Sequence, residues 1–227
     1  MVFPFPTICP ALGVTELAFV TSATSTQHNG SIAMPSGIQA GDIIIVGQQW
    51  RGQENNTADY PGSGFTSISN LYNAGGSLVN DDYYKSHTSY KIATGSEAGA
   101  SISGFADQGA YTYNSAGIYI YRPNAEATAV TQVNKYTYQG NGNPAQNILY
   151  GSTSGAATIA LAVAGCNNYP GITFTGATPD ASINLNNAGS DLRMRAYGAN
   201  KGSGVDITTD MSDDGANLFT SVLLEIT

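Results

Sequence analysis

Short apolar runs rich in Val, Ile, Tyr, Phe and Thr alternate with clusters of Gly, Asn, Ser and Pro along the whole chain. No stretch carries apolar residues at helical spacing over three turns, and the alternation is typical of a sandwich or a barrel. We therefore predict an all-β protein with an antiparallel, jelly-roll-like β-sandwich fold. The expected strands are Val14–Val20, Ser31–Met34, Asp42–Trp50, Phe65–Leu71, Tyr83–Ile92, Ala100–Phe105, Ala116–Arg122, Val130–Tyr138, Asn147–Tyr150, Thr158–Cys166, Ile172–Thr175, Asp191–Tyr197, Val205–Thr208 and Leu218–Ile226.

Two patterns distinguish these strands. In Tyr83–Ile92 the even positions carry the more apolar residues, whereas the odd positions include Lys85 and His87. Side chains alternate between the faces of a strand, so this pattern predicts one face exposed to water. By contrast, Ile43–Val46 and Ile159–Val163 are continuously apolar, which predicts central strands covered on both faces.

The second half of the chain faintly repeats the order of strands and turns in the first half. Ser31 lies 12 residues before Ile43 (43 − 31), and Asn147 lies 12 residues before Ile159 (159 − 147). A Pro-Gly pair follows in each half, at 61–62 and 170–171. We predict one sandwich domain at 14–227 with two similar halves, about 24–123 and 132–227. Chance resemblance between Gly-rich β segments is the alternative.

The first 13 residues differ from the rest. They are apolar, lack Lys and Arg, and are interrupted by Pro4, Pro6 and Pro10. Proline favours an extended chain, so we predict an N-terminal arm that lies on a neighbouring molecule, or else a frayed end. The charged region of a signal peptide is missing, which predicts a protein made in the cytosol.

Composition excludes several classes of partner. Charged residues make up only 11% of the chain, against about 25% in an ordinary domain. The net charge is −8 and the eight basic residues are dispersed, so we predict no binding to nucleic acid, which needs clustered cations. No apolar run approaches the roughly 18 residues that span a bilayer, so no membrane partner is expected.

Residues that could carry chemistry are few. His28 and His87 are the only histidines, and no metalloprotease, hydrolase, P-loop or dinucleotide motif is present. The spacing of Cys9 and Cys166 fits neither a zinc site nor a disulfide framework. A single disulfide bond between the two remains an alternative to two free thiols. Acid pairs such as Asp81-Asp82 and Asp213-Asp214 lie in Gly-, Ser- or Thr-rich connections that indicate solvated loops or, at most, a weak calcium site. We predict no catalytic, cofactor-binding or metal-binding residues.

Aromatic residues are the remaining candidates for binding. Trp50 and the tyrosines could form a platform for sugar rings or a partner protein, because tyrosine supplies contact area and a polar hydroxyl. Tyrosine is also an ordinary residue of strand cores and rims. The candidate interaction surface comprises Tyr83, Tyr84, Tyr111, Tyr113, Phe3 and Phe5.

The run SGIQAGDIIIV, followed by PGSGFTSIS, YKIATGSEAGASISGF and AGIYIYRP, resembles a β module common in bacteriophage structural proteins. The resemblance covers roughly residues 30–123 and consists of turn and core residues. The matching positions are Pro35, Gly37, Ala40, Gly41, Asp42, Pro61, Phe65, Thr66, Tyr90, Lys91, Ala93, Glu97, Tyr121 and Arg122.

This resemblance implies a non-enzymatic virion protein, made in the host cytoplasm. The first hypothesis is a capsid decoration or cement protein that packs on the outer shell, with the major capsid protein or other virion proteins as partners. We expect a homo-oligomer, with a trimer favoured over other oligomeric states. The alternative is a tail-fibre or receptor-binding module that recognises host surface glycan. A polysaccharide-degrading enzyme is a third hypothesis, without a catalytic constellation to support it.

Overall fold

The computed structural model describes residues 13–26, 29–52, 59–73, 83–107, 113–141, 148–150, 156–166, 172–185, 191–200, 207–211 and 216–227. In these ranges the regular elements are β-strands, and the strand pairs are antiparallel. The predicted all-β sandwich is therefore confirmed, whereas its jelly-roll connection stays a prediction. The described residues contain no helix long and apolar enough to cross a membrane.

The first half of the chain forms one five-stranded sheet and a two-stranded outer sheet. The five-stranded sheet has the order β1-β7-β3-β5-β4, and β2 pairs with β6 in the outer sheet. The strands are β1 (Leu17–Thr26), β2 (Asn29–Ala33), β3 (Ile43–Gly52), β4 (Thr66–Asn73), β5 (Tyr83–Ile92), β6 (Ser101–Asp107) and β7 (Tyr113–Pro123).

The second half forms another five-stranded sheet and a three-stranded outer sheet. The five-stranded sheet has the order β8-β15-β10-β13-β12, and the outer sheet has the order β11-β14-β9. The strands are β8 (Val130–Asn141), β9 (Ile148–Tyr150), β10 (Ala157–Cys166), β11 (Ile172–Thr175), β12 (Ala181–Leu185), β13 (Asp191–Ala199), β14 (Ile207–Met211) and β15 (Ala216–Ile226).

The two five-stranded sheets have the same strand order when β1, β7, β3, β5 and β4 are matched to β8, β15, β10, β13 and β12. A register shift recurs at the matched place. Val20 of β1 is the extra residue opposite Ile120 and Tyr121, and Val133 of β8 is the extra residue opposite Leu223 and Leu224. The structural halves are thus β1–β7 and β8–β15. The boundaries at 24 and 132 expected from the sequence fall inside β1 and β8 and do not mark their starts.

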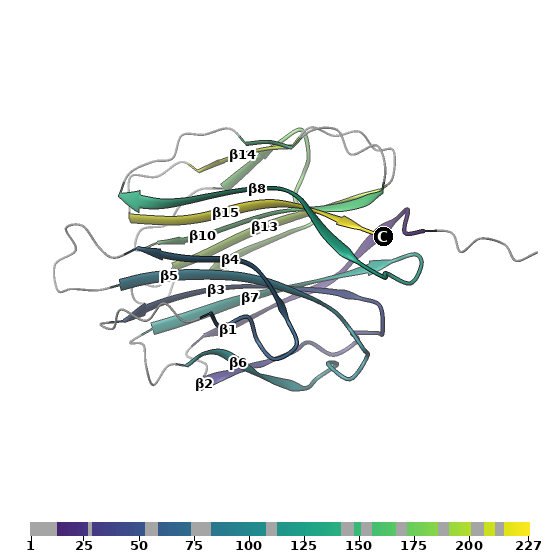
Figure 1. Cartoon of the computed structure of the whole chain (residues 1–227), viewed down its shortest axis with the longest axis horizontal. Helices are drawn as coiled ribbons and strands as arrows, with labels where there is room; N and C mark the ends of the chain where they lie inside the picture. The colour runs from purple at the N-terminus through teal and green to yellow at the C-terminus, as the bar shows by residue number, and fades with distance from the viewer. Residues whose placement is uncertain are drawn as a thin grey trace, which may run out of the picture.

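The sheets stack in four layers, with the two five-stranded sheets in the middle (Figure 1). Apolar side chains from both halves, including Ile43, Ile45, Ile159 and Leu161, form the core between these sheets. A second core lies under β2 and β6, and a third lies under β11. The prediction that Ile43–Val46 and Ile159–Val163 are covered on both faces is confirmed, since all of these residues have 0–1% exposure.

Between the central sheets, glycines of one sheet face larger side chains of the other. A Cβ atom added to Gly47 of β3 would lie 2.7 Å from the Met194 sulfur and 3.1 Å from Val163 Cγ1. A Cβ atom added to Gly165 of β10 would overlap the Gln49 side chain. These glycines therefore set the spacing between the two halves by leaving room for the partner side chain.

Two expectations about strands need correction. The sequence pattern missed β12, which is only five residues long and occupies the edge position that β4 has in the first sheet. The predicted wet face of β5 is also wrong, because Lys85, His87 and Ser89 are all buried. The chain segment Asp59–Phe65, here called the strap, contacts His87 and Ser89, and Ser89 Oγ donates to the Pro61 carbonyl of the strap at 2.8 Å.

Candidate functional site

The strap lies on the outer face of the first five-stranded sheet, the face turned away from the second half. Gln48 Nε2 of β3 donates to the Tyr60 carbonyl at 2.9 Å. On the other side of the strap, Gly62 N donates to the Gly104 carbonyl of β6 at 3.1 Å. The strap is therefore bonded both to the sheet beneath it and to the outer sheet beside it.

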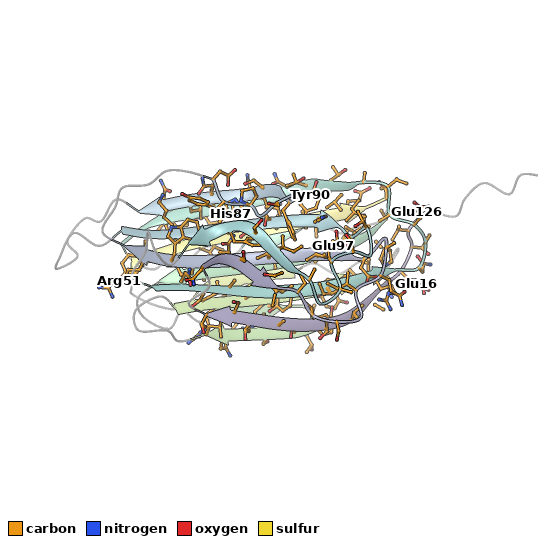
Figure 2. The ribbon with its side chains drawn as sticks, turned by 90° about the horizontal axis from the view of Figure 1, so that it is seen from below. Glu16, Arg51, His87, Tyr90, Glu97 and Glu126 are labelled. Carbon is orange, nitrogen blue, oxygen red and sulfur yellow. The ribbon has the colours of Figure 1, made fainter. Side chains whose placement is uncertain are left out.

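His87 is the titratable group at the centre of this face, and Figure 2 shows it among the strands rather than at the periphery. Its Nε2 atom lies 2.5 Å from Asp59 Oδ1 and 3.0 Å from Ser67 Oγ. Its Nδ1 atom is buried, and the described residues place no hydrogen-bond partner on it. Burial lowers the pKa of His87, and the charge and hydrogen bond of Asp59 oppose that decrease.

Serine, histidine and aspartate thus meet here, but not in the arrangement of a catalytic triad. In a triad the aspartate holds Nδ1 of the imidazole while Nε2 takes the proton of the serine. In this protein Asp59 and Ser67 both contact Nε2 of His87. The histidine therefore has no second nitrogen oriented by a carboxylate, and the geometry ties the strap and β4 to β5.

Trp50 and Lys85 extend the cluster along the same face. The Lys85 ammonium lies 6.0 Å from the centre of the Trp50 ring, and the ring of Tyr60 packs edge-on against Trp50 with a centroid distance of 6.1 Å. Burial lowers the pKa of Lys85 to about 8. The indole thus lies beside an ammonium group that is withdrawn from water.

A second polar cluster closes the opposite end of the first sheet. Asp42, at the start of β3, is 1% exposed. Arg122 of β7 binds it through Nε to Oδ1 and through Nη2 to Oδ2, both at 2.8 Å. Gln39 N also donates to Oδ2 at 2.8 Å. This two-pronged pair fixes the loop before β3 to the end of β7.

The turn after β5 is closed by Glu97, which is also 1% exposed. Its Oε2 atom accepts hydrogen bonds from the backbone N–H groups of Thr94 and Gly95, both at 3.0 Å. Lys91 Nζ lies 2.7 Å from its Oε1 atom. Although burial raises the pKa of Glu97, its hydrogen bonds and the Lys91 charge outweigh that effect and lower the pKa overall.

The charged residues of these two clusters, Asp42, Lys91, Glu97 and Arg122, are all among the motif positions named from the sequence. Ala93 exchanges backbone hydrogen bonds with the 41–42 turn, so the Asp42 and Glu97 clusters meet at one corner of the module. A groove of about 430 Å³ opens beside it. The groove is lined by Gln39, Ala40, Gly41, Asp42, Arg122, Pro123, Asn124, Ala125 and Glu126.

The candidate aromatic surface is not assembled by the described side chains. Tyr84 is 2% exposed and packs with Leu71 and Leu218, so its expected role on the surface is wrong. Tyr83 and Tyr113 lie on β5 and β7, but their side chains, like Tyr111, Phe3 and Phe5, lie outside the described residues. The same holds for the side chain of Cys166, for Cys9 and for the acid pairs at 81–82 and 213–214.

The sequence pattern missed the link between His87, Asp59 and Ser67. These residues are separated by 28 (87 − 59) and 20 (87 − 67) positions, and no motif spans them. The signal nearest to them was the Pro61-Gly62 pair, which marks the strap. The described residues hold no group of three or more His, Cys, Asp or Glu side chains arranged for a metal ion.

Comparison with family models, curated proteins and solved structures found no match to this chain.

Proposed function

We propose that this chain is a non-enzymatic bacteriophage virion protein that packs on the outer surface of the capsid as a decoration protein. The observation that carries the proposal is the corner formed by Asp42, Arg122, Ala93 and Glu97. These four residues are among the positions that resemble phage structural modules, and they form one connected set of contacts.

The contacts of His87 also support a role in binding. The buried polar side chains of the strap face join strands and loops to one another. A rigid sandwich with such fixed loops suits adhesion to a neighbouring protein, where pre-ordered surfaces lose little entropy on binding. Weak contacts become effective when they are repeated many times over a shell.

The copy number of this chain per particle is the direct test. Purified virions that contain the chain would be analysed by quantitative mass spectrometry, with the major capsid protein as the internal reference. We expect a ratio close to a simple fraction of the major capsid protein. A handful of copies per particle would contradict decoration and place the chain in the tail.

A second experiment tests the N-terminal arm. A variant lacking residues 2–12 removes the segment proposed to contact the shell and retains every described strand. Full-length and shortened protein would be added to particles that lack the chain. We expect only the full-length protein to bind at saturating copy number. Saturable binding of the isolated protein to host glycan instead would favour a receptor-binding module.

A further inference from the structure

The strap combines a strong structural role with a titratable contact. It contacts the buried side chains of Trp50, His87 and Ser89 on the outer face of the first sheet. Its contacts with the sheet include hydrogen bonds that involve the Tyr60 and Pro61 carbonyls and one contact between Asp59 and His87. Of these, only the last changes with pH in the range where histidine titrates.

The protonation state of His87 at neutral pH follows from its partners. A carboxylate can only accept a hydrogen bond, so Nε2 carries the proton that is donated to Asp59. Nδ1 then carries a lone pair that receives no hydrogen bond from the described residues. A second proton would have to be placed on Nδ1, where the described residues offer no acceptor, and a buried N–H group without an acceptor is costly.

The charges around the ring do not favour this second proton strongly. Among the described side chains, the strap contributes Asp59, whose side chain is 48% exposed and therefore screened by water. The same face of β5 contributes Lys85, and Lys91, which is paired with Glu97. β3, β6 and β7 contribute the uncharged residues Gln48, Trp50, Ala106 and Asn114. Detachment of the strap would let water solvate both nitrogens of the ring.

We propose that His87 and the strap form an acid-sensitive latch, in which protonation of His87 releases Asp59–Phe65 from the outer face of the first sheet and uncovers Trp50. The sandwich remains folded, because the core between the two halves contains no described histidine. This inference uses strap contacts that also support the proposed function, but it depends only on contacts within one chain and is tested on the isolated protein. Its biological use would be a change of surface on entry into an acidic compartment.

Trp50 is the only tryptophan, so its fluorescence reports on the strap directly. Acrylamide quenching of the full-length protein would be measured from pH 7.5 to pH 4.5, with far-ultraviolet circular dichroism in parallel. We expect a reversible loss of protection from quenching with a midpoint below 6.5, the ordinary histidine pKa, while the strand signal stays constant. Unchanged quenching over this range would overturn the proposal, as would loss of the strand signal together with protection.

Variants identify the titrating group. His87→Gln keeps a donor for Asp59 but does not titrate, and we expect it to lose the transition. His28→Gln is the matched control that removes the only other histidine, and it should keep the transition. A transition that persists in His87→Gln would overturn the proposal.

If His87→Gln does not fold, the His28→Gln protein provides a second test of the same proposal. Its only imidazole is that of His87, so one set of ring resonances can be followed by NMR across the same pH range. We expect the midpoint of the ring titration to coincide with the midpoint of Trp50 quenching. Two distinct midpoints would contradict the latch.

Discussion

At the scale of single residues, buried charged groups join parts of the chain that are distant in sequence. Asp42 and Arg122 are separated by 80 positions and hold the loop before β3 against the end of β7. Glu97 gathers two backbone N–H groups and the Lys91 ammonium at the turn after β5. Each carboxylate has partners for both oxygens, which is the condition under which a buried charge is tolerated.

The replacement Asp42→Asn tests the first of these contacts. It keeps the size of the side chain but leaves the Arg122 guanidinium beside a neutral group. Since the Arg122 side chain is 35% exposed, we expect a loss of about 2–3 kcal/mol in the free energy of unfolding, less than for a fully buried pair. Urea denaturation would measure this. Glu126→Gln, in the same groove but exposed, should change stability by less than about 0.5 kcal/mol.

Lys85 makes stability depend on pH on the alkaline side. Its pKa is lowered by burial to about 8 in the folded protein and returns to 10.5 on unfolding. Between these values the unfolded chain binds more protons than the folded chain, so the contribution of Lys85 to stability rises with pH. Below pH 8 both states are protonated and the cost of burying the ammonium is present in full.

We therefore expect the stability of the wild type, relative to Lys85→Met, to increase from pH 8 to pH 10. Tyrosines begin to titrate in the same pH range. Their effect on the free energy of unfolding is common to the wild type and Lys85→Met, so it cancels in the comparison. Chemical denaturation at half-unit steps would measure the difference. A difference that stays constant or falls over this interval would contradict the assignment.

At the scale of elements, irregular positions in the edge strands carry specific contacts. The pairing of β4 with β5 skips Ile68, and Lys135 Nζ of β8 donates to the Ile68 carbonyl at 3.0 Å. The lysine thus connects the edge of the first sheet to the edge of the second. Bulges and lysines are also the features that keep an edge strand from pairing with other chains.

The close contact between β3 and β10 predicts that adding one methyl group at Gly165 destabilises the protein. A methyl group at Gly165 overlaps the Gln49 side chain, so Gly165→Ala should lower the free energy of unfolding by about 1–3 kcal/mol. Shortening the opposing side chain in the double variant Gln49→Ala/Gly165→Ala should recover part of this loss. A thermal or urea double-mutant cycle measures the coupling.

Gly13→Ala is the control for this cycle, because no atom lies within 4 Å of the added methyl group. We expect it to leave stability within about 0.5 kcal/mol of the wild type. If the double variant were as unstable as the sum of the two single variants, the overlap with Gln49 would not be the cause of the loss.

At the scale of the whole molecule, the two halves face each other with approximate two-fold symmetry. β4 contacts β8, and the matched strands β12 and β1 are in contact as well. In the same way, β7 contacts β13 while β15 contacts β5. Each half supplies one apolar face to the shared core. Neither half therefore has a complete core of its own between the central sheets.

This arrangement predicts that the halves depend on each other. A cut between Ala125 and Glu126, in the connection between β7 and β8, would separate them without dividing a strand. We expect each fragment alone to self-associate or precipitate, because it exposes a large apolar face. Co-expressed fragments should purify as a one-to-one complex. A soluble, monomeric and folded single half would contradict the shared core.

The sequence predicted most of the strands because their signal is local. Ile43–Val46 and Ile159–Val163 are continuously apolar, and only a strand covered on both faces accommodates such a run. The origin of the two halves as a repeat stays a prediction, although the strand orders of the two five-stranded sheets match. The short β12 escaped prediction because an edge strand of five residues, ASINL, carries too little pattern.

The surroundings of β5 were decided by tertiary structure alone. Alternation places Lys85, His87 and Ser89 on one face, and polar residues in this pattern ordinarily face water. The strap instead crosses that face and supplies Asp59 and the Pro61 carbonyl as partners. A hydrogen bond satisfies a polar group as water would, so the local pattern of polar residues cannot distinguish a wet face from one that a distant segment covers.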